Sequence, residues 1–436
     1  MPTSEARRVA FTVLRRTFDQ GAYTDRAFQA VAIGLEPRDR ALAMRLAYGA
    51  VQRCGTLDHL IELCADRPVA KLDAVVRACL RLGVYELCFT ADAPHAAVNE
   101  AVELAGESRG QGLVNAVLRR IARDHVQLLA ALDDSTPARA AQLHSVPAWI
   151  VEHWWGLLGP DDTRALLARF NEPAEHALRA NTTVTDAAGL ASRLGVRALV
   201  PGDPPEAVVV LEPFDAHGSV LWRDGALMPQ SRASMIAALA LDPQPGERVL
   251  DMCAAPGAKT THLAALMQRE GEIVALERNE GRARELAATL TRMRSQVARI
   301  EICDAGAYVA GEPFARVLLD APCSGLGTIH SRPDLRWRVS PDSVRALAVE
   351  QARLLSAAAL ATAPGGTLVY STCTISAAEN EHQIGAFLDE HREFTAIDIE
   401  PRFPAWRDPR GGRQLLALPH VQGSDGFYIA ALRRQG

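Results

Sequence analysis

The sequence lacks several features that mark common classes of protein. Its 436 residues contain no run of about 18 apolar residues and no apolar run at the start, so we expect a cytoplasmic protein without an export signal or membrane span. Its eight cysteines form no Cys-x-x-Cys pair and no cluster with histidine, which argues against a zinc site or a disulfide scaffold. We therefore expect no metal. The net charge of −5 argues against nonspecific coating of nucleic acid but leaves room for a local basic face.

Lysine is the scarcest of the charged residues. Only Lys71 and Lys259 occur among the 47 lysines and arginines of the chain. Lys259 lies just after a turn of small residues, from Ala254 to Ala258. The composition alone does not account for a lysine at that place, so we expect Lys259 to have a specific role.

The chain around that turn is typical of a ligand-binding strand-turn-helix unit. Val249 and Leu250 end a short apolar run, and Asp251 follows where the predicted strand ends. Small side chains in the turn let the backbone approach a ligand, and the following helix presents free N–H groups. The spacing is neither that of a Walker loop nor Gly-x-Gly-x-x-Gly, so an ordinary strand-to-helix turn is the alternative.

Three further predicted strands also end in acidic residues. Ile273 to Leu276 ends in Glu277, Val297 to Ile302 ends in Cys303 and Asp304, and Val317 to Leu319 ends in Asp320. An acid at the end of the second strand can accept hydrogen bonds from both hydroxyls of a ribose. The carboxyl ends of these strands are expected to line one edge of a parallel sheet, where a nucleotide-like ligand binds.

The rest of the chain divides by pattern into three parts. Residues 1–140 show apolar spacing typical of helices, residues 141–225 alternate helical and strand-like segments, and residues 226–436 carry the predicted parallel sheet. The segment 124–146 has the composition of a linker. Predicted helices of the first part are Arg7–Phe18, Pro37–Arg53, Lys71–Phe89, Ala93–Glu107 and Gly112–Arg123.

The bases of the first part occur in bunches. Each bunch is explained equally well by a solvated helix face or by a contact with RNA. The bunched residues are Arg7, Arg8, Arg15, Arg16, Arg119, Arg120 and Arg123.

Two of the cysteines differ from the others in their surroundings. A lone cysteine near a strand end is usually a small buried hydrophobic residue. Cys323 and Cys373 instead lie in the polar turns Pro-Cys-Ser-Gly and Thr-Cys-Thr, each directly after a predicted strand. A thiolate that adds to carbon-6 of cytosine makes carbon-5 able to take a methyl group, provided that the pKa of the thiol is lowered. Asp320 could then hydrogen-bond the ring at nitrogen-3 and the amino group.

These motifs resemble those of the RNA 5-methylcytosine methyltransferases that use S-adenosylmethionine. The matching stretches are Asp251 to Thr260, Asp320 to Gly325, Ser371 to Thr374 and Glu379 to Glu381. Three N-terminal stretches, Leu80–Leu87, Ala97–Val102 and Val114–Arg119, resemble the NusB-like RNA-binding fold. The combination is similar to the family of ribosomal RNA small subunit methyltransferase B, also called the Sun/Fmu family.

The resemblance implies a multidomain fold over nearly the whole chain. It implies an all-α NusB-like RNA-binding domain at 1–140, a small α+β linker module at 141–225 and a Rossmann-like α/β class I methyltransferase domain at 226–436. It implies Cys373 as the nucleophile, Cys323 as the cysteine that assists product release, and cytosine 967 of 16S rRNA as the usual target. The implied cofactor-binding residues are Cys253, Ala254, Ala255, Pro256, Gly257, Ala258, Lys259, Glu277, Asp304 and Asp320.

Two residues depart from the family pattern, and one loop is assigned on chemistry alone. Ala258 stands where the family commonly has a second glycine, and Glu277 replaces a common aspartate. In the loop 330–338, arginines beside an aromatic residue suit contacts with RNA phosphates and bases, although Trp337 could instead fill the protein core. The predicted RNA-binding residues are Arg332, Arg336, Trp337 and Arg338.

Three other functions stay open. One is a NusB-like RNA-binding or transcription factor with an inactive methyltransferase-like domain. Another is a methyltransferase that acts on tRNA. A third is a DNA cytosine methyltransferase, which would use the Pro-Cys cysteine alone. We expect a monomer that binds 16S rRNA, either free or in an early assembly particle.

Overall fold

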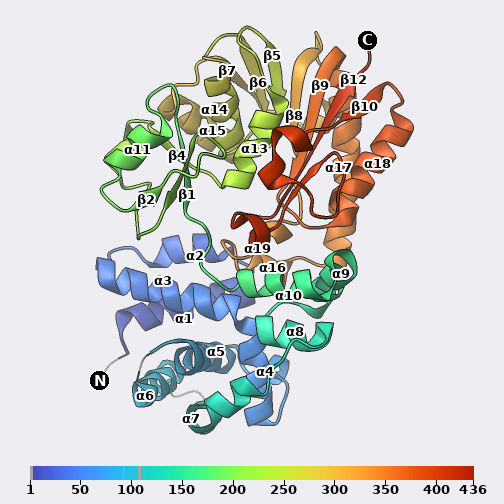
Figure 1. The fold of residues 1–436 in the computed structure, drawn as a ribbon. Helices are drawn as coiled ribbons and strands as arrows, with labels where there is room; N and C mark the ends of the chain where they lie inside the picture. Colours follow the sequence, from blue (N-terminus) through green and yellow to red (C-terminus); the bar gives the residue numbers. More distant parts are fainter. Residues whose placement is uncertain (1–2, 92, 107–109) are drawn as a thin grey trace. The chain divides into compact units, whose positions relative to one another are not determined.

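The computed structural model describes residues 3–91, 93–106 and 110–436 (Figure 1). Contacts divide the chain into two compact units. The helical unit comprises Met1–Pro173 with Ile329–Arg338, and the sheet unit comprises Ala174–Thr328 with Val339–Gly436. The chain therefore leaves the sheet unit after Thr328 and returns to it at Val339.

The described residues of the helical unit form helices and no strand, which confirms the predicted all-α class. The central helix is α5, which contacts α1, α3, α4, α6 and α7 and has a largely buried sequence. The predicted Ala93–Glu107 helix ends within the described residues at Ala105; residue 107 lies outside them. The helices are α1 (Glu5–Asp19), α2 (Thr24–Val31), α3 (Pro37–Gln52), α4 (Cys54–Ala65), α5 (Ala74–Phe89), α6 (Pro94–Ala105), α7 (Gln111–Ala130), α8 (Pro137–His144), α9 (Ala148–Leu158), α10 (Pro160–Arg169) and α16 (Leu335–Arg338), with a 3₁₀ turn at Val69–Lys71.

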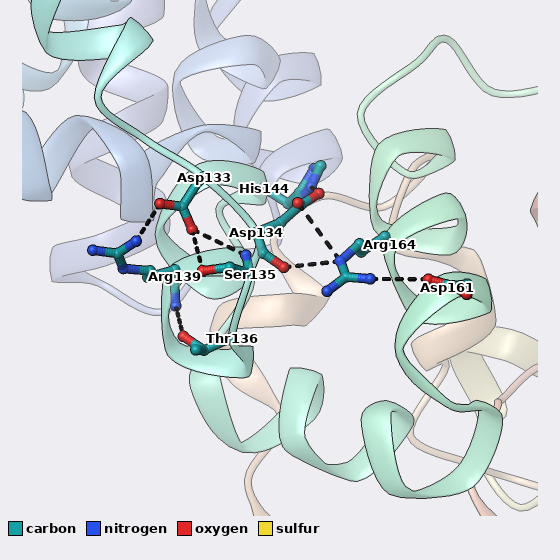
Figure 2. A network of polar contacts seen from close by, with 8 residues as sticks. All are labelled: Asp133, Asp134, Ser135, Thr136, Arg139, His144, Asp161 and Arg164. Atoms are coloured by element: carbon teal, nitrogen blue, oxygen red, sulfur yellow. Dashed lines mark hydrogen bonds and ion pairs between the residues drawn. The ribbon is translucent and has the colours of Figure 1, made fainter.

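The predicted linker at 124–146 is wrong, because the segment is mostly helical. The turn residues within it are caps and ion-pair partners (Figure 2). The Thr136 hydroxyl accepts a hydrogen bond from the Arg139 N–H and so caps α8. The Asp133 carboxylate pairs with the Arg139 guanidinium, while the Asp134 carbonyl accepts from Arg164 Nε at 2.9 Å. The polar residues of this segment therefore cap helices and form ion pairs, and do not mark a linker.

Helices α8, α9 and α10 also belong to the helical unit, so its end lies near Pro173 and the predicted boundary at 140 falls inside α8. These helices belong to the helical unit because they contribute large buried aromatic side chains to it. Trp154 of α9 and Phe170 are fully buried, with ring centroids 5.4 Å apart. The Phe170 carbonyl accepts from Gln52 Nε2 of α3 at 2.9 Å, which ties this segment to the N-terminal helices.

One member of the first arginine bunch is buried in an ion-pair network. Arg7 Nε and Nη2 donate to Glu86 Oε2 at 2.8 and 2.6 Å, and Arg7 Nη1 donates to Glu100 Oε1 at 3.1 Å. Glu86 is 1% exposed, so the Arg7–Glu86 pair is buried, whereas the Arg7–Glu100 pair is partly exposed; together they join α1, α5 and α6. Arg8, Arg119, Arg120 and Arg123 are exposed. The choice between a solvated face and an RNA contact therefore stays open for these four and for the partly buried Arg15 and Arg16, but not for Arg7.

We expect Arg7→Met to destabilise the helical unit by roughly 3–5 kcal/mol, because it leaves the Glu86 carboxylate buried without its cation. Native-state hydrogen exchange of the α1 and α5 amides in the full chain measures this free energy. Arg8→Met, which changes an exposed neighbour on the same helix, should stay within about 0.5 kcal/mol of the wild type. Equal protection in both variants would show that the Arg7–Glu86 pair does not stabilise the fold.

The sheet unit begins with a small antiparallel sheet in the order β2-β3-β1-β4. It lies between residues 177 and 229, so its last strand passes the predicted boundary at 225. Helix α11 (Ala187–Arg193) packs on β1 and β3, and Leu178, Leu190 and Val208 are in its core. The strands are β1 (Ala177–Ala180), β2 (Ala198–Leu199), β3 (Ala207–Val210) and β4 (Leu227–Pro229), with a short helix α12 (Val220–Arg223).

The second sheet has the order β10-β12-β9-β8-β5-β6-β7, with β11 paired to β12. Strands β9, β8, β5, β6 and β7 are parallel, as predicted, while β12 and β10 are antiparallel additions at one edge. Its strands are β5 (Arg248–Asp251), β6 (Glu272–Leu276), β7 (Ala298–Glu301), β8 (Phe314–Asp320), β9 (Thr362–Thr372), β10 (Phe394–Ile397), β11 (Leu415–Ala417) and β12 (Phe427–Arg434).

Helices cover both faces of this sheet (Figure 1). Ile236 of α13 and Leu263 of α14 share a buried core with Val249 and Leu318 of the sheet, whereas α17 packs on β8 and β9 from the other side. Strand β5 lies between β6 and β8, where the strand order reverses, so ligands are expected at the carboxyl end of β5. The helices are α13 (Arg232–Leu241), α14 (Ala258–Leu266), α15 (Glu280–Arg292), α17 (Pro341–Ala361), α18 (Glu381–Glu390) and α19 (Pro419–Gln422).

Candidate active site

The turn between β5 and α14 is held in a shape that only glycine allows at one position. Gly257 has φ +104°, and a Cβ there would lie 2.9 Å from Leu286 Cδ1. The Ala254 N–H donates to the Leu276 carbonyl at 3.0 Å, which fastens the turn to the end of β6. The backbone of the turn is thereby fixed at the strand-order reversal, with the first N–H groups of α14 directly after it.

Asp251, the last residue of β5, fixes the start of α14 through a hydrogen bond to Thr260. It is 1% exposed, and its Oδ2 accepts from Thr260 Oγ1 at 2.7 Å. Burial raises the pKa of Asp251 to about 6, against the lowering effect of the Thr260 hydrogen bond. This carboxyl group therefore has a structural part in the site that the motif alone did not assign to it.

Glu277 lies at the end of β6 and is almost fully buried. Its Oε1 accepts from the Asn279 N–H at 2.9 Å, and its Oε2 is 3.5 Å from Arg282 Nη1. The same guanidinium donates through Nη2 to the Ala255 carbonyl at 2.7 Å. Arg282 thus links the predicted ribose acceptor to the turn and fixes the distance between them.

Lys259 and Asp320 form an ion pair at the ends of α14 and β8. Lys259 Nζ donates to Asp320 Oδ2 at 2.6 Å, and Ser371 Oγ of β9 donates to Asp320 Oδ1 at 2.8 Å. Lys259 Nζ also lies 5.0 Å from the centre of the Phe427 ring. Both oxygens of Asp320 are therefore oriented by donors from neighbouring elements, as expected for an acid that must present a fixed edge to a ligand.

The two cysteines predicted to act together are adjacent. Cys323 Sγ lies 3.3 Å from Cys373 Sγ, in the loops that follow β8 and β9. The Gly327 N–H donates to the Cys373 carbonyl at 3.0 Å, which joins the two loops. The hydrogen bond to Cys373, and then burial, raise the pKa of Cys323 well above its usual range, so Cys323 holds its proton in this arrangement.

The other cysteines have no such pairing. Burial also raises the pKa of Cys253, which makes this turn residue an inert thiol.

Asp304 lies beyond Glu277 along the sheet edge and accepts a hydrogen bond from Arg353 Nη2 at 2.7 Å. That hydrogen bond lowers the pKa of Asp304. From β9 to β7, the strand ends therefore present Cys373, Asp320, the turn, Glu277 and Asp304 in sequence.

The loop 330–338 belongs to the helical unit. Arg336 is fully buried and donates to the carbonyls of Gln52, Ser145 and Ile329 at 3.2, 3.1 and 2.9 Å. Trp337 Nε1 donates to the Val51 carbonyl at 2.7 Å. Both side chains are therefore engaged in protein contacts, in line with the alternative that this loop fills the core.

The other two predicted RNA-binding residues of that loop are exposed. Arg338 donates to the Gly21 carbonyl at 2.9 Å and lies 4.1 Å from the centre of the Tyr23 ring. Arg332 is exposed as well. RNA binding stays a prediction for all four residues, and the contacts of Arg336 and Trp337 show that these two side chains also hold the loop against the helices.

None of the described helices is both long and apolar enough to cross a membrane. In the same part of the chain, no group of three or more His, Cys, Asp or Glu side chains is arranged to hold a metal ion.

Residues 238–433 match the family of 16S rRNA methyltransferase RsmB/F, and residues 4–123 match the NusB family. The probable ribosomal RNA small subunit methyltransferase B of Synechocystis is 37% identical over 98% of this chain and 99% of its own. The chain belongs to the ribosomal RNA small subunit methyltransferase B family. The Vibrio cholerae member is 32% identical over 98% of this chain and 97% of its own. The crystal structure of PH0851 is 27% identical, covers 99% of this chain and 98% of its own, and has a TM-score of 0.80.

This member of the methyltransferase B family also uses residues that sequence reasoning missed. Arg282 contacts Glu277 and Ser371 donates to Asp320. Arg282 does not stand out in sequence from ordinary surface residues, and Ser371 belongs to a matched motif that assigns it no role. Glu379 was noted only as part of a motif, and the structure places it fully buried behind the cysteine loops. Its signal in the sequence is weak, because Glu379 begins the polar run that ends at Gln383, where an acid is usually exposed.

Proposed function

We propose that this methyltransferase transfers a methyl group from S-adenosylmethionine to carbon-5 of a cytosine in 16S rRNA. The family target, cytosine 967, is the proposed site. The observation that carries the proposal is the 3.3 Å approach of Cys323 and Cys373 beside the oriented carboxylate of Asp320. A single structural thiol needs no such partner, whereas attack on a ring and later release of the ring use two groups.

The residues around the turn fit the proposed cofactor. Gly257 lets the turn pack closely against Leu286 of α15, the first N–H groups of α14 are available to polar atoms, and Glu277 offers a carboxylate to ribose hydroxyls. Asp304 and Asp320 flank this position along the sheet edge. When bound there, S-adenosylmethionine would supply an electrophilic methyl group.

The residues of the chain would perform the remaining steps on the cytosine. Cys373 Sγ forms a bond to carbon-6, which places electron density on carbon-5, while the Asp320 carboxylate accepts hydrogen bonds from protonated nitrogen-3 and from the amino group. Carbon-5 takes the methyl group and then loses its proton to a base. The electron pair of the broken carbon–hydrogen bond forms the carbon-5–carbon-6 double bond, the carbon–sulfur bond breaks with its electrons going to Cys373 Sγ, and Cys323 assists this release. The covalent adduct divides one difficult substitution into two easier steps.

A direct assay tests the proposed substrate. The purified chain is incubated with methyl-labelled S-adenosylmethionine and either deproteinised 16S rRNA, tRNA or DNA, and the nucleosides are identified by mass spectrometry. We expect 5-methylcytidine in 16S rRNA only. Label in tRNA or in DNA alone would assign a different substrate, and no label in any of them would support an RNA-binding protein with an inactive catalytic domain.

Glu277→Ala should weaken binding of S-adenosylmethionine by roughly 1.5–3 kcal/mol, because the ribose hydroxyls lose a charged acceptor. Isothermal titration calorimetry measures the change. Glu280→Ala, which removes an acid from the exposed first turn of α15, is the matched control and should bind as the wild type does. Unchanged affinity in Glu277→Ala would show that the ribose is held elsewhere.

A further inference from the structure

Glu379 is a fully buried carboxylate directly behind the two cysteine loops. Its Oε1 accepts from the Ser324 N–H at 2.8 Å and from Gln351 Nε2 at 3.2 Å, and its Oε2 accepts from Ser324 Oγ at 2.6 Å. All three donors are neutral. Burying a carboxylate costs more free energy than burying the amide of a glutamine at the same position, so the presence of an acid here calls for an explanation.

The hydrogen bonds of Glu379 connect it to both cysteines. Ser324 directly follows Cys323, and Thr374 directly follows Cys373. The hydroxyls of Ser324 and Thr374 are 2.7 Å apart. Since the Glu379 carboxylate only accepts, Ser324 Oγ must donate to it and is left to accept from Thr374 Oγ1. One carboxylate thereby fixes the direction of a hydrogen-bond chain that joins the two loops.

The residue after Glu379 holds the second loop on either side of its cysteine. Asn380 Oδ1 accepts from Thr372 Oγ1 at 2.5 Å, and Asn380 Nδ2 donates to the Thr374 carbonyl at 3.0 Å. The Glu379 carbonyl itself accepts from the Tyr370 hydroxyl of β9 at 2.6 Å. The backbone around Cys373 is therefore tied to the same short segment that carries the buried acid.

We infer that Glu379 is a positioning residue that sets the spacing of Cys323 and Cys373 and confines the reactive thiolate to Cys373. This inference rests on the proposed cysteine chemistry. A fixed negative charge behind the Cys323 loop opposes a second negative charge on Cys323, which then keeps its proton and can donate its S–H to Cys373. Among the causes that raise the pKa of Cys323, after the Cys373 hydrogen bond and burial, is the charge of Glu379.

The test compares Glu379→Gln with Glu379→Asp and with Glu390→Gln, which changes an exposed acid at the C-terminal end of α18. Two quantities are measured in the full chain. One is the rate of covalent adduct formation on RNA that carries 5-fluorocytosine at the target, with S-adenosylmethionine present. The other is the pH dependence of iodoacetamide labelling of each cysteine, resolved by peptide mass spectrometry.

In Glu379→Gln we expect adduct formation at least about tenfold slower and labelling of Cys323 at least about tenfold faster at pH 8. Glu379→Asp keeps the charge but shortens the reach, so its adduct should form slowly while Cys323 stays protected. Glu390→Gln should match the wild type in both measurements. This pattern separates the charge of Glu379 from its length, which a merely structural role would not do.

Wild-type adduct rates and wild-type labelling in Glu379→Gln would overturn the inference. If Glu379→Gln does not fold, Ser324→Ala removes the hydroxyl that links the two loops but keeps the charge of Glu379, so it should slow adduct formation while Cys323 stays protected; a wild-type adduct rate there would equally overturn the inference. If the wild type itself forms no adduct, the proposed function fails instead, which keeps the two failures distinguishable.

Discussion

Cys373→Ala is expected to transfer no measurable methyl group to 16S rRNA, a loss of at least about 10⁴-fold. The reason is that no thiolate then reaches carbon-6, and nucleophile removal has effects of this size in enzymes that use covalent adducts. Transfer of label from S-adenosylmethionine measures the loss, and binding of the cofactor should be unchanged. Cys64→Ala, which removes a partly exposed thiol of α4, is the control and should keep full activity.

The same variant should also fail to form a covalent species with RNA. A substrate that carries 5-fluorocytosine has no removable proton on carbon-5, so the wild type should be trapped on it and appear as a protein–RNA band on a denaturing gel. Cys373→Ala should give no such band. A band of wild-type intensity in Cys373→Ala would place the nucleophile at another residue.

Cys323→Ala should fail at a later step. Its Cys373 thiolate can still attack and the ring can still take a methyl group, but release is not assisted, so a methylated protein–RNA adduct should accumulate on ordinary RNA. Gel analysis followed by nuclease digestion and mass spectrometry of the Cys373 peptide detects it. Turnover beyond one methyl group per enzyme should fall steeply, while the first methyl transfer should persist.

The opposite pattern would reverse the assignment. If Cys373→Ala accumulates the adduct and Cys323→Ala forms none, then Cys323 attacks, as expected of an enzyme of the DNA cytosine type. Position does not decide between them, because both thiols lie at neighbouring strand ends and are 3.3 Å apart. If no variant and no fluorinated substrate gives an adduct, covalent catalysis is excluded.

The line of acids and cysteines at the sheet edge was predictable from sequence because each follows a short apolar strand. Parallel strands bring their carboxyl ends to one edge, so Glu277, Asp320 and Cys373 had to lie near the turn once the strands were recognised. The Lys259–Asp320 ion pair follows from the same placement. Its distance and the Ser371 hydrogen bond that completes it needed the structure.

Other features cannot be predicted from the sequence, because they depend on local spacing or on contacts between segments that are distant in the chain. Helices α2 and α4 were missed, the first because it has only eight residues and the second because Arg53 alone separates it from α3. Strand β10 is a short edge strand that exists through its pairing with β12. Arg336 has the charge of an RNA-binding residue, yet its buried guanidinium donates to the backbone carbonyls of Gln52, Ser145 and Ile329, two of which are far away in sequence.

The central claim is that this chain makes one 5-methylcytosine in 16S rRNA by way of Cys373. Mapping of 5-methylcytosine in rRNA from a strain that lacks the chain, complemented with the wild type or with Cys373→Ala, tests it most directly. We predict that a single 16S rRNA cytosine, at the family position 967, loses its methyl group on deletion and regains it with the wild type only. An unchanged methylation map on deletion, or restoration by Cys373→Ala, would contradict the account.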